Sequence, residues 1–446
     1  MTATQTPHDL VQDYAFEAPQ HDRPRVVVVG GGFGGIHAVK ALRRAEAQVI
    51  LVDRNNHHLF QPLLYQVATS ILSPADIASP LRQVFRRQRN VIVAQADVVG
   101  VDPSRRFVHI KNEASLEYDY LVLATGVQSS YFGHDEFAAY APALKSLADA
   151  DLIRNRILAA FETCEKQIRP ADHPELLTFV LVGGGPTGVE MAGAIAQLAR
   201  NTLASEFRRY DPRSLRIILV EGAPRILPTF DEKLAMKAQR KLESLGVEVR
   251  TSSRVELVDA AGAVIGGERV PSKNVFWTAG VTPPPIADWL GAEADRTHRV
   301  KVNPDCSVPD HPEVFVIGDA ASHESNGKPL PGLAQVAMQQ GTYVGRLIKR
   351  RMARKPAPRA FRYWDKGTMA VVAPGFAILQ GMGLRMSGFL ATVAWAVIHV
   401  TYLALPSNRV RTLLVWMWTA ITRRRTDCLI IEPKTLPKPP LELPGT

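Results

Sequence analysis

Glycines and acids at repeated spacings are the residues of this sequence whose types and arrangement suit chemistry. The pattern G-x-G-x-x-G occurs in residues 30–35 and again in residues 183–188. Glycines at these positions permit a tight turn, a close approach of backbone to a pyrophosphate and close packing of helix on strand. After each pattern, the next apolar stretch ends in an acid, Asp53 or Glu221, the residue type that binds a ribose 2′-hydroxyl. The sequence therefore predicts two dinucleotide sites.

The segments around both glycine patterns have the order of elements that such sites need. Residues 25–29 (RVVVV) suit a strand buried on both faces, and a helical pattern and a second apolar strand, residues 48–53, follow the glycines. The same order recurs in residues 177–221. A glycine pattern alone is weak evidence, whereas one in this context is specific. Because Gly30 and Gly183 lie 153 residues apart, we expect an α/β protein with two Rossmann-like domains rather than a short repeat.

Other strand ends add to this picture. An acid at position 221 favours NADH, because it would repel the 2′-phosphate of NADPH. Apolar strands also meet small turns in residues 120–126 (YLVLATG), 274–280 (NVFWTAG) and 314–321 (VFVIGDAA). Each of these is, taken singly, more often an ordinary strand end. Their order along the chain, together with the two glycine patterns, favours a functional role for these turns.

Charge and cysteine usage exclude several classes of protein. Hydrophobic residues make up 46% and charged residues 22%, as in a globular protein, and the net charge is +10. Residues 341–425 contain fifteen Lys or Arg and one acid, so the basicity belongs to one segment and we expect no nucleic-acid partner. Cys164, Cys306 and Cys428 are far apart, which excludes a disulfide framework, a thiolate zinc site and a dithiol redox centre.

Targeting and metal signals are weak. Residues 1–24 contain acids, prolines and no apolar run, so we expect a disordered tail rather than a secretion signal or a membrane span. With the cysteine spacing, this favours the cytoplasm. His57 and His58 are adjacent and lack an acid or a third histidine at ligand spacing, so we expect no metal site. Basic clusters such as Arg86–Arg87 are expected to be solvated.

The whole order of motifs, GxGxxG, ATG, GxGxxG, TAG and GD, resembles the flavoprotein pyridine nucleotide reductases. Three further stretches are more specific: residues 60–69 (FQPLLYQVAT), 334–341 (AQVAMQQG) and 365–370 (DKGTMA). With a basic, Trp-rich C-terminus, they resemble the type II NADH dehydrogenases, which are single-chain, non-pumping NADH:quinone oxidoreductases. The resemblance implies FAD and NADH as cofactors, and ubiquinone or menaquinone, between which the motifs do not choose, as the acceptor.

The resemblance also implies roles for individual residues. FAD would bind to a discontinuous domain and NADH to a domain inserted in it. The implied cofactor-binding residues are Gly30, Gly32, Phe33, Gly34, Gly35, Asp53, Gln61, Ala124, Thr125, Gly126, Gly183, Gly185, Thr187, Gly188, Glu221, Gly280, Asp319, Ala320 and Gln335. Asp319 would meet the ribityl chain of the flavin.

Four residues are candidates for catalysis. Glu190 follows the second glycine pattern, and the family links this position to nicotinamide placement and proton supply; the alternative is an acid in the first turn that only stabilises the helix dipole. Gln335 and Gln339 lie at i and i+4 on a helix that starts near residue 333. The resemblance assigns them to the junction of flavin and quinone, whereas such pairs are otherwise usually solvated. Lys366 is a weaker candidate near the quinone head.

The C-terminal segment predicts contact with a membrane. Residues 388–405 carry no formal charge and residues 413–421 are also apolar, and arginines flank both. A single transmembrane helix over 388–405 is less favoured, because it would place a basic flank outside. We expect amphipathic helices in the interface of an anionic bilayer, with Trp395, Trp416 and Trp418 near the headgroups. The alternative is a helix pair buried in a homodimer.

These inferences give an overall expectation. The domains would be an FAD-binding domain (25–145 and 286–385), an NADH-binding domain (146–285) and a membrane-associating region (386–446). The enzyme would lie peripherally on the cytoplasmic face of the cell inner membrane and feed a respiratory chain. The alternative function is an NADH-sensing signalling flavoprotein of the apoptosis-inducing-factor type. A sulfide:quinone reductase is disfavoured, because it requires catalytic cysteines near the flavin.

Overall fold

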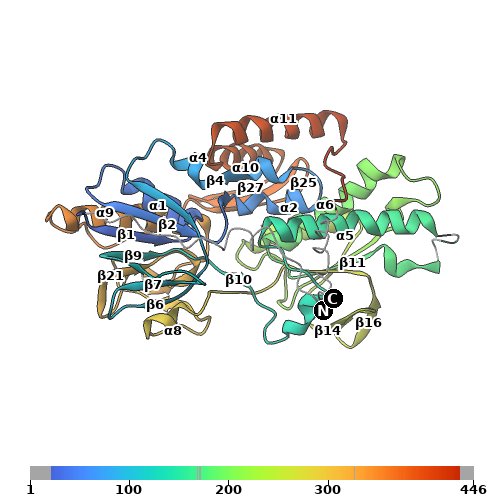
Figure 1. Cartoon of the computed structure of the whole chain (residues 1–446). Coiled ribbons are helices and arrows are strands. Elements are labelled where there is room, and N and C mark those ends of the chain that lie inside the picture. Colours follow the sequence, from blue (N-terminus) through green and yellow to red (C-terminus); the bar gives the residue numbers. More distant parts are fainter. Residues whose placement is uncertain (1–21, 168, 170–171, 326, 432–446) are drawn as a thin grey trace, which may run out of the picture.

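A computed structural model of the chain describes residues 22–431, apart from residues 168, 170–171 and 326. The tail expected over residues 1–24 therefore lies almost entirely outside the described residues. Two α/β units lie side by side, and two helices, α10 (Phe389–Tyr402) and α11 (Pro406–Thr422), lie along one edge of the molecule (Figure 1). The predicted class, α/β with two Rossmann-like units and C-terminal helices, is confirmed.

The first unit is built on a six-stranded sheet with the order β20-β21-β9-β1-β2-β5. Its strands are β1 (Arg25–Val29), β2 (Gln48–Asp53), β5 (Val91–Gln95), β9 (Tyr120–Leu123), β20 (Ser307–Val308) and β21 (His311–Val316). All pairs are parallel except β20 with β21. Val26, Val27 and Val28 are fully buried, as a parallel strand covered on both faces requires. The sheet thus joins segments from both ends of the chain.

Two helices of the first unit are in very close contact. A Cβ atom on Gly341 of α9 (Ala334–Met352) would lie 2.1 Å from the carbonyl oxygen of Gly34 in α1 (Phe33–Ala41). One on Gly345 would lie 2.6 Å from the Ala38 oxygen. The AQVAMQQG segment is therefore held against the first glycine pattern because glycines remove the side chains that would separate the two helices.

The second unit has a four-stranded parallel sheet with the order β13-β12-β11-β17. Its strands are β11 (Thr178–Val182), β12 (Arg216–Val220), β13 (Val247–Arg250) and β17 (Asn274–Trp277), and its helices are α5 (Leu147–Lys166), α6 (Pro186–Gln197) and α7 (Glu232–Ser244). A short pair of strands, β10 (Gln128–Ser129) with β18 (Val281–Thr282), connects the two units. Both units thus repeat the order that the sequence predicts.

A third sheet lies between the second unit and the C-terminal helices. It consists of β25 (Thr368–Ala373), β26 (Phe376–Gly381) and β27 (Leu384–Gly388), all antiparallel. A Cβ atom on Gly193 of α6 would lie 1.9 Å from the carbonyl oxygen of Val372, so β25 is packed directly on α6. The expected boundary at residue 385 falls inside β27.

The described chain also contains shorter strands and α-helices. They are β3 (His57–Leu59), β4 (Ala78–Pro80), β6 (Val98–Asp102), β7 (Phe107–Ile110), β8 (Leu116–Glu117), β14 (Val255–Asp259), β15 (Gly262–Ile265), β16 (Glu268–Pro271), β19 (Val300–Lys301), β22 (Ala321–Ser322), β23 (Glu324–Ser325), β24 (Lys328–Pro329), α2 (Leu64–Ala68), α3 (Pro74–Ile77), α4 (Leu81–Phe85) and α8 (Ile286–Leu290).

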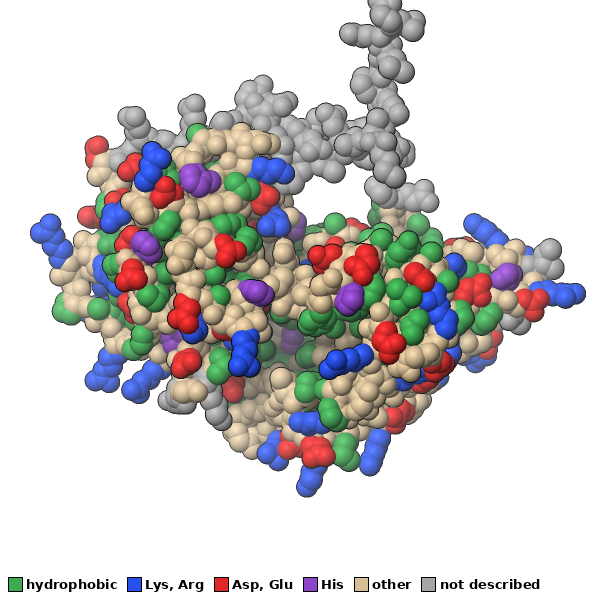
Figure 2. Space-filling view, turned by 90° about the horizontal axis from the view of Figure 1, so that it is seen from below, with side chains coloured by type: hydrophobic (Ala, Val, Ile, Leu, Met, Phe, Trp, Pro, Cys, Tyr) green, Lys and Arg blue, Asp and Glu red, His purple; other side chains and the backbone are tan. Residues whose placement is uncertain are grey.

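Helices α10 and α11 expose an apolar face. Twelve large hydrophobic side chains on them are at least 37% exposed: Phe389, Leu390, Val393, Val397, Ile398, Tyr402, Val410, Leu413, Leu414, Met417, Trp418 and Ile421. The opposite side of the molecule instead mixes acidic and basic side chains (Figure 2). Among the described residues, each helix is too short or too polar to cross a membrane.

The structure corrects two expectations about this segment. Trp395 is buried, and Trp416 packs against it with ring centroids 5.0 Å apart, so only Trp418 of the three tryptophans is exposed. The arginines are also less free than expected: Arg425 binds the backbone oxygens of Thr69 and Ala194. Trp416 donates its indole N–H to Gln66 of α2, and Arg425 binds α6 and the end of α2. These contacts anchor the C-terminal segment to the protein.

Candidate active site

The glycines of the first loop differ in how much space a side chain would have. Gly30 has φ of +103°, and a Cβ atom on it would lie 2.3 Å from the Ala124 oxygen. A Cβ atom on Gly35 would lie 1.8 Å from the Gly30 oxygen, whereas one on Gly32 would have no described atom within 4 Å. Gly30 and Gly35 therefore shape the turn, and Gly32 leaves its backbone open to a ligand at the start of α1.

The second loop repeats this arrangement. Gly183 has φ of +114°, and a Cβ atom on Gly188 would lie 1.9 Å from the Gly183 oxygen. One on Gly185 would have no described atom within 4 Å. Pro186 and Thr187 begin α6, and Pro suits that position because the first N–H groups of a helix have no partner within it.

Each of the two acids holds its glycine loop through the backbone. Asp53 accepts hydrogen bonds from the N–H groups of Gly31 (2.5 Å) and Asn55 (2.7 Å). Glu221 accepts them from Gly184 (2.7 Å) and Ala223 (2.8 Å). Each carboxylate oxygen has two lone pairs, so Asp53 and Glu221 can each still accept a hydrogen bond from a ribose hydroxyl.

The sequence pattern does not predict the roles of Gly31 and Gly184, because they fall between its defining positions. The triplet GGG, which occurs in both loops, is the signal that could have found them. Burial raises the pKa of Asp53, and its two backbone hydrogen bonds oppose that rise.

The ATG and GD turns lie beside the first loop. The Thr125 hydroxyl is buried and has no hydrogen-bond partner among the described residues, while Gly126 has φ of +64° and open space around it. Gly318 donates its N–H to the side-chain oxygen of Gln340 on α9 (2.7 Å). The motifs do not identify Gln340, because its role depends on the contact with Gly318, which only the fold shows. Its side chain is buried on α9.

Asp319 and Gln61 share a neighbour in Lys145. Burial raises the pKa of Asp319, and the charge of Lys145 opposes that rise. Gln61 donates to the Lys145 carbonyl oxygen at 3.5 Å, and Ala320 is buried beside Asp319. The structure thus brings these predicted residues to one side of the first unit, together with a lysine that carried no sequence signal.

Aromatic rings support the first loop. Phe33 meets His58 edge to face, with centroids 5.1 Å apart, and His58 Nδ1 is 3.0 Å from the Gly31 oxygen. Burial lowers the pKa of His58 to about 4, so this ring is neutral at physiological pH. Among the described residues there is no group of three or more potential metal ligands, and His58 serves as a support for the loop.

Glu190 is placed differently from the alternative considered above. Helix α6 begins at Pro186, so Glu190 lies in the second turn and not at the helix terminus. The side chain is buried and accepts a hydrogen bond from the Val371 N–H of β25 at 3.2 Å. Burial raises its pKa to about 8. A helix-dipole role is therefore wrong, and Glu190 is an acid able to hold a proton near neutral pH.

Gln335 and Gln339 both bind one segment of backbone. Gln339 donates to the Trp364 oxygen (2.9 Å) and accepts from the Trp364 N–H (3.0 Å). Gln335 donates to Gly367 O (2.8 Å) and accepts from the Lys366 N–H (3.2 Å). The two amides fix residues 364–367 along α9, so this segment is held at the entrance to β25.

Lys366 reaches from this segment to the C-terminal helices. Its Nζ donates to the hydroxyl of Tyr402 at 3.0 Å and lies 5.2 Å from the centre of the Trp364 ring. Gly280, in contrast, lies at the turn between the units, where a Cβ atom would meet Phe132 at 2.5 Å. The structure therefore groups Gln335 and Gln339 with Lys366 around residues 364–367, and Lys366 contacts α10. Gly280 instead lies beside the second loop.

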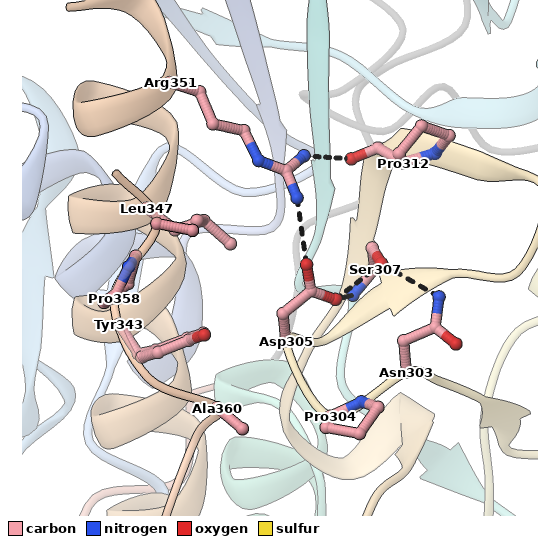
Figure 3. Close-up of a pocket in the computed structure, with 11 residues that line it drawn as sticks. Asn303, Pro304, Asp305, Ser307, Pro312, Tyr343, Leu347, Arg351, Pro358 and Ala360 are labelled. Carbon is pink, nitrogen blue, oxygen red and sulfur yellow. Dashed lines mark hydrogen bonds and ion pairs between the residues drawn. The ribbon is translucent and has the colours of Figure 1, made fainter. Parts of the chain in front are cut away.

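A cavity of about 390 Å³ lies elsewhere (Figure 3). Pro312 at the start of β21, Tyr343 and Leu347 of α9, and the ion pair of Arg351 with Asp305 (2.9 Å) line it. The cofactor loops follow the carboxyl ends of parallel strands, whereas this cavity lies at the other end of β21. It contains none of the predicted site residues.

Comparison with known proteins agrees with this geometry. Residues 24–341 match the pyridine nucleotide-disulphide oxidoreductase family. The chain is 42% identical over 434 residues to the type II NADH:quinone oxidoreductase Ndh of Mycobacterium tuberculosis, covering 94% of this chain and 93% of the relative. This chain belongs to the type II NADH:quinone oxidoreductase family.

Other proteins similar to this chain differ more from it in sequence. A type II NADH:quinone oxidoreductase of Staphylococcus haemolyticus is 28% identical, with 81% of this chain and 90% of the relative covered. The solved structure of NDH2 from Plasmodium falciparum in complex with NADH has a TM-score of 0.81 at 19% identity, covering 89% of this chain and 98% of that one. This likeness concerns the fold.

The residues present fit the two cofactors of the family. Both loops leave open backbone at a helix N-terminus where a pyrophosphate binds, and Thr125 offers a buried hydroxyl with no described partner. FMN lacks the pyrophosphate that the first loop suits, so FAD is the flavin that fits.

Proposed function

We propose that this chain is a flavoenzyme that passes electrons from NADH to a lipid-soluble quinone without proton pumping. One observation carries the proposal: β25 joins the separate parts of the site. Its Val371 N–H binds Glu190 beside the second loop, and the segment before it is fixed by Gln335 and Gln339 on the helix that packs against the first loop.

The residues of the chain divide the work. Bound FAD would supply the redox chemistry, taking hydride from NADH and passing two electrons to a quinone that takes up two protons. The loops at residues 30–35 and 183–188 bind the two pyrophosphates, and Asp53 and Glu221 bind the riboses. Glu190 holds a proton inside the protein. Gln335, Gln339 and Lys366 shape the quinone side, where Lys366 lies at the exposed helices.

A stopped-flow experiment tests this function. The flavin of the purified protein is bleached with NADH in the absence of oxygen, and a short-chain quinone is then added. We expect rapid bleaching with NADH, little with NADPH, and immediate recovery with quinone. Bleaching that persists with quinone would favour the NADH-sensing signalling alternative. A protein without flavin colour would contradict both.

We also propose that α10 and α11 bind the enzyme peripherally to an anionic bilayer, on the cytoplasmic face of the cell membrane. The twelve exposed apolar side chains on these helices support this proposal, and exposed Arg423 and Arg424 follow them. A quinone is dissolved in lipid, so a site beside these helices would receive it directly. The competing occupant of this face is a second copy of the chain.

Flotation with lipid vesicles distinguishes the two occupants. Leu414→Glu, on the exposed face of α11, is expected to abolish binding to vesicles of mixed zwitterionic and anionic phospholipid. Leu257→Glu changes another exposed leucine, on β14 (42% exposed, against 54% for Leu414), and should leave binding intact. Unchanged flotation of Leu414→Glu, with a shift from dimer to monomer in light scattering, would assign the face to a homodimer.

A further inference from the structure

Phe132 is an exposed aromatic residue on a strained turn between the two units. It follows β10, which lies where the units meet (Figure 1). Its side chain is 68% exposed, more than any other large hydrophobic side chain among the described residues from 22 to 363. Its backbone has φ of +55°, a conformation that bulky residues rarely adopt. The fold alone therefore gives no reason for a large apolar side chain at this position.

The ring of Phe132 lies on the turn that follows β17. A Cβ atom on Gly280 would be 2.5 Å from Cζ at the tip of this ring. The segment before the ring is fixed to the same turn: the Ser130 N–H donates to the Gly280 oxygen (3.2 Å), and the Ser130 oxygen accepts from the Trp277 indole N–H (2.9 Å). The Phe132 N–H donates to the Ser130 hydroxyl (3.2 Å). The ring is therefore held at the end of β17, although most of it is open to solvent.

The turn under this ring, residues 278–280, is packed against the second glycine loop. The Thr278 hydroxyl donates to the Gly183 oxygen at 3.1 Å. A Cβ atom on Gly183 would lie only 2.8 Å from the backbone nitrogen of Ala279. The glycine loop, the turn and the phenyl ring are thus joined by a continuous series of contacts.

The order of the strands shows which end of a dinucleotide would meet this turn. In the sheet β13-β12-β11-β17, the chain adds β12 and β13 on one side of β11 and then places β17 on the other. A dinucleotide binds across the crevice at such a switch point, outside the carboxyl ends of the strands. Glu221 follows β12 and would bind the adenosine ribose. The nicotinamide end would therefore extend over the β17 side, where Phe132 lies.

We propose that Phe132 contacts the nicotinamide ring of the dinucleotide and helps to hold it in place. This inference deepens the proposed function, because it rests on the loop at residues 183–188 as the NADH site. Nicotinamide is a flat ring, cationic in NAD⁺, and such rings pack favourably on an aromatic side chain. A phenyl ring that receives this ligand has to be exposed in the free enzyme, which accounts for its position on the strained turn.

Equilibrium binding of two ligands to the full-length, FAD-loaded protein tests this contact. NAD⁺ carries the nicotinamide ring, whereas ADP-ribose is the same molecule without that ring. Phe132→Asn removes the phenyl ring, and asparagine adopts positive φ more readily than phenylalanine, so the Tm should not fall. We expect isothermal titration calorimetry to show NAD⁺ binding weakened by about 3-fold to 10-fold and ADP-ribose binding unchanged.

Matched variants keep the proposal falsifiable. Phe132→Tyr keeps the ring and should bind both ligands as the wild type does. Phe132→Gly, which also allows positive φ, should repeat the selective loss if Phe132→Asn does not fold. Tyr140→Asn removes another exposed ring of the same connection (39% exposed) and should change neither affinity.

Two results would overturn the proposal. One is unchanged NAD⁺ binding in Phe132→Asn. The other is an equal loss for NAD⁺ and ADP-ribose, which would mean that the phenyl ring only supports the glycine loop. A reduced flavin that quinone does not reoxidise would instead count against the proposed function alone, because the two affinities are measured without turnover.

Discussion

The open space beside Gly185 allows a test of the second loop in which the fold and the ligand respond in opposite ways. A Cβ atom there has no described neighbour within 4 Å. The backbone has φ of −70° and ψ of −178°, which alanine adopts without strain. Gly185→Ala therefore adds one methyl group to the surface where we expect the pyrophosphate of NADH, and to nothing else.

The expected magnitudes follow from these contacts. Replacing a glycine by alanine at a compatible position stabilises the folded state by about 0.4–1 kcal/mol, because the unfolded chain loses freedom. A methyl group forced against a closely bound ligand costs about 1–3 kcal/mol, which weakens NADH binding by about 5-fold to about 150-fold. The variant should be at least as stable as the wild type and bind NADH more weakly.

Two measurements check this expectation. The rate of flavin reduction at increasing NADH concentration gives the affinity, and thermal unfolding gives the stability. Gly188→Ala is the matched control, since its Cβ would lie 1.9 Å from the Gly183 oxygen and should destabilise the fold. Gly32→Ala places the same methyl group in the first loop and should instead reduce the amount of FAD retained.

One result would refute the reasoning. If Gly185→Ala keeps the stability of the wild type and binds NADH equally well, the loop at residues 183–188 does not hold the pyrophosphate. A loss of stability in Gly185→Ala would contradict the geometry of the loop itself.

Three further predictions concern the surroundings of the site. Gln339→Leu removes two hydrogen bonds to the Trp364 backbone and should lower the free energy of unfolding by about 1–2 kcal/mol. In stopped-flow traces it should slow flavin reoxidation by quinone but not flavin reduction by NADH. The reverse pattern would show that the quinone does not bind on this side. Asp427→Asn weakens the ion pair with buried Arg154 (2.7 Å), which keeps Asp151 as a second partner. The free energy of unfolding in urea should fall by about 1–3 kcal/mol, and an unchanged midpoint would show that the segment after α11 is not anchored there. Relative to Glu190→Gln, the wild type should lose on the order of 5 kcal/mol of stability between pH 4.5 and about 8, and a difference that is constant with pH would show that Glu190 does not retain its proton.

The sequence predicted the parts of the fold that depend on local pattern. The valines of residues 26–29 and the glycines of both loops define strands and turns within a few residues, because buried strands need continuous apolar side chains and positive φ favours glycine. The start of α9 was predicted near residue 333 and is at Ala334. The roles assigned to individual site residues stay predictions.

Contacts between distant segments could not be read from local pattern. Nothing in the spacing of Trp395 and Trp416 shows that their rings pack inward, because an apolar helix face offers the same pattern to lipid and to protein. Arg425 stands in a basic run, RRR, whose other members are exposed. It binds two carbonyl oxygens only because α2 and α6 meet beside it.

The position of β25 explains how the C-terminal segment is packed against the candidate active site. The strand is packed on α6 through Gly193, its approach is fixed by the glutamines of α9, and its sheet continues through β27 directly into α10. The exposed helices are therefore joined to Glu190 through β25, whose Val371 N–H binds that carboxylate. If α10 and α11 lie on a bilayer, the surface that receives the quinone and the acid that holds the proton are parts of one packed structure.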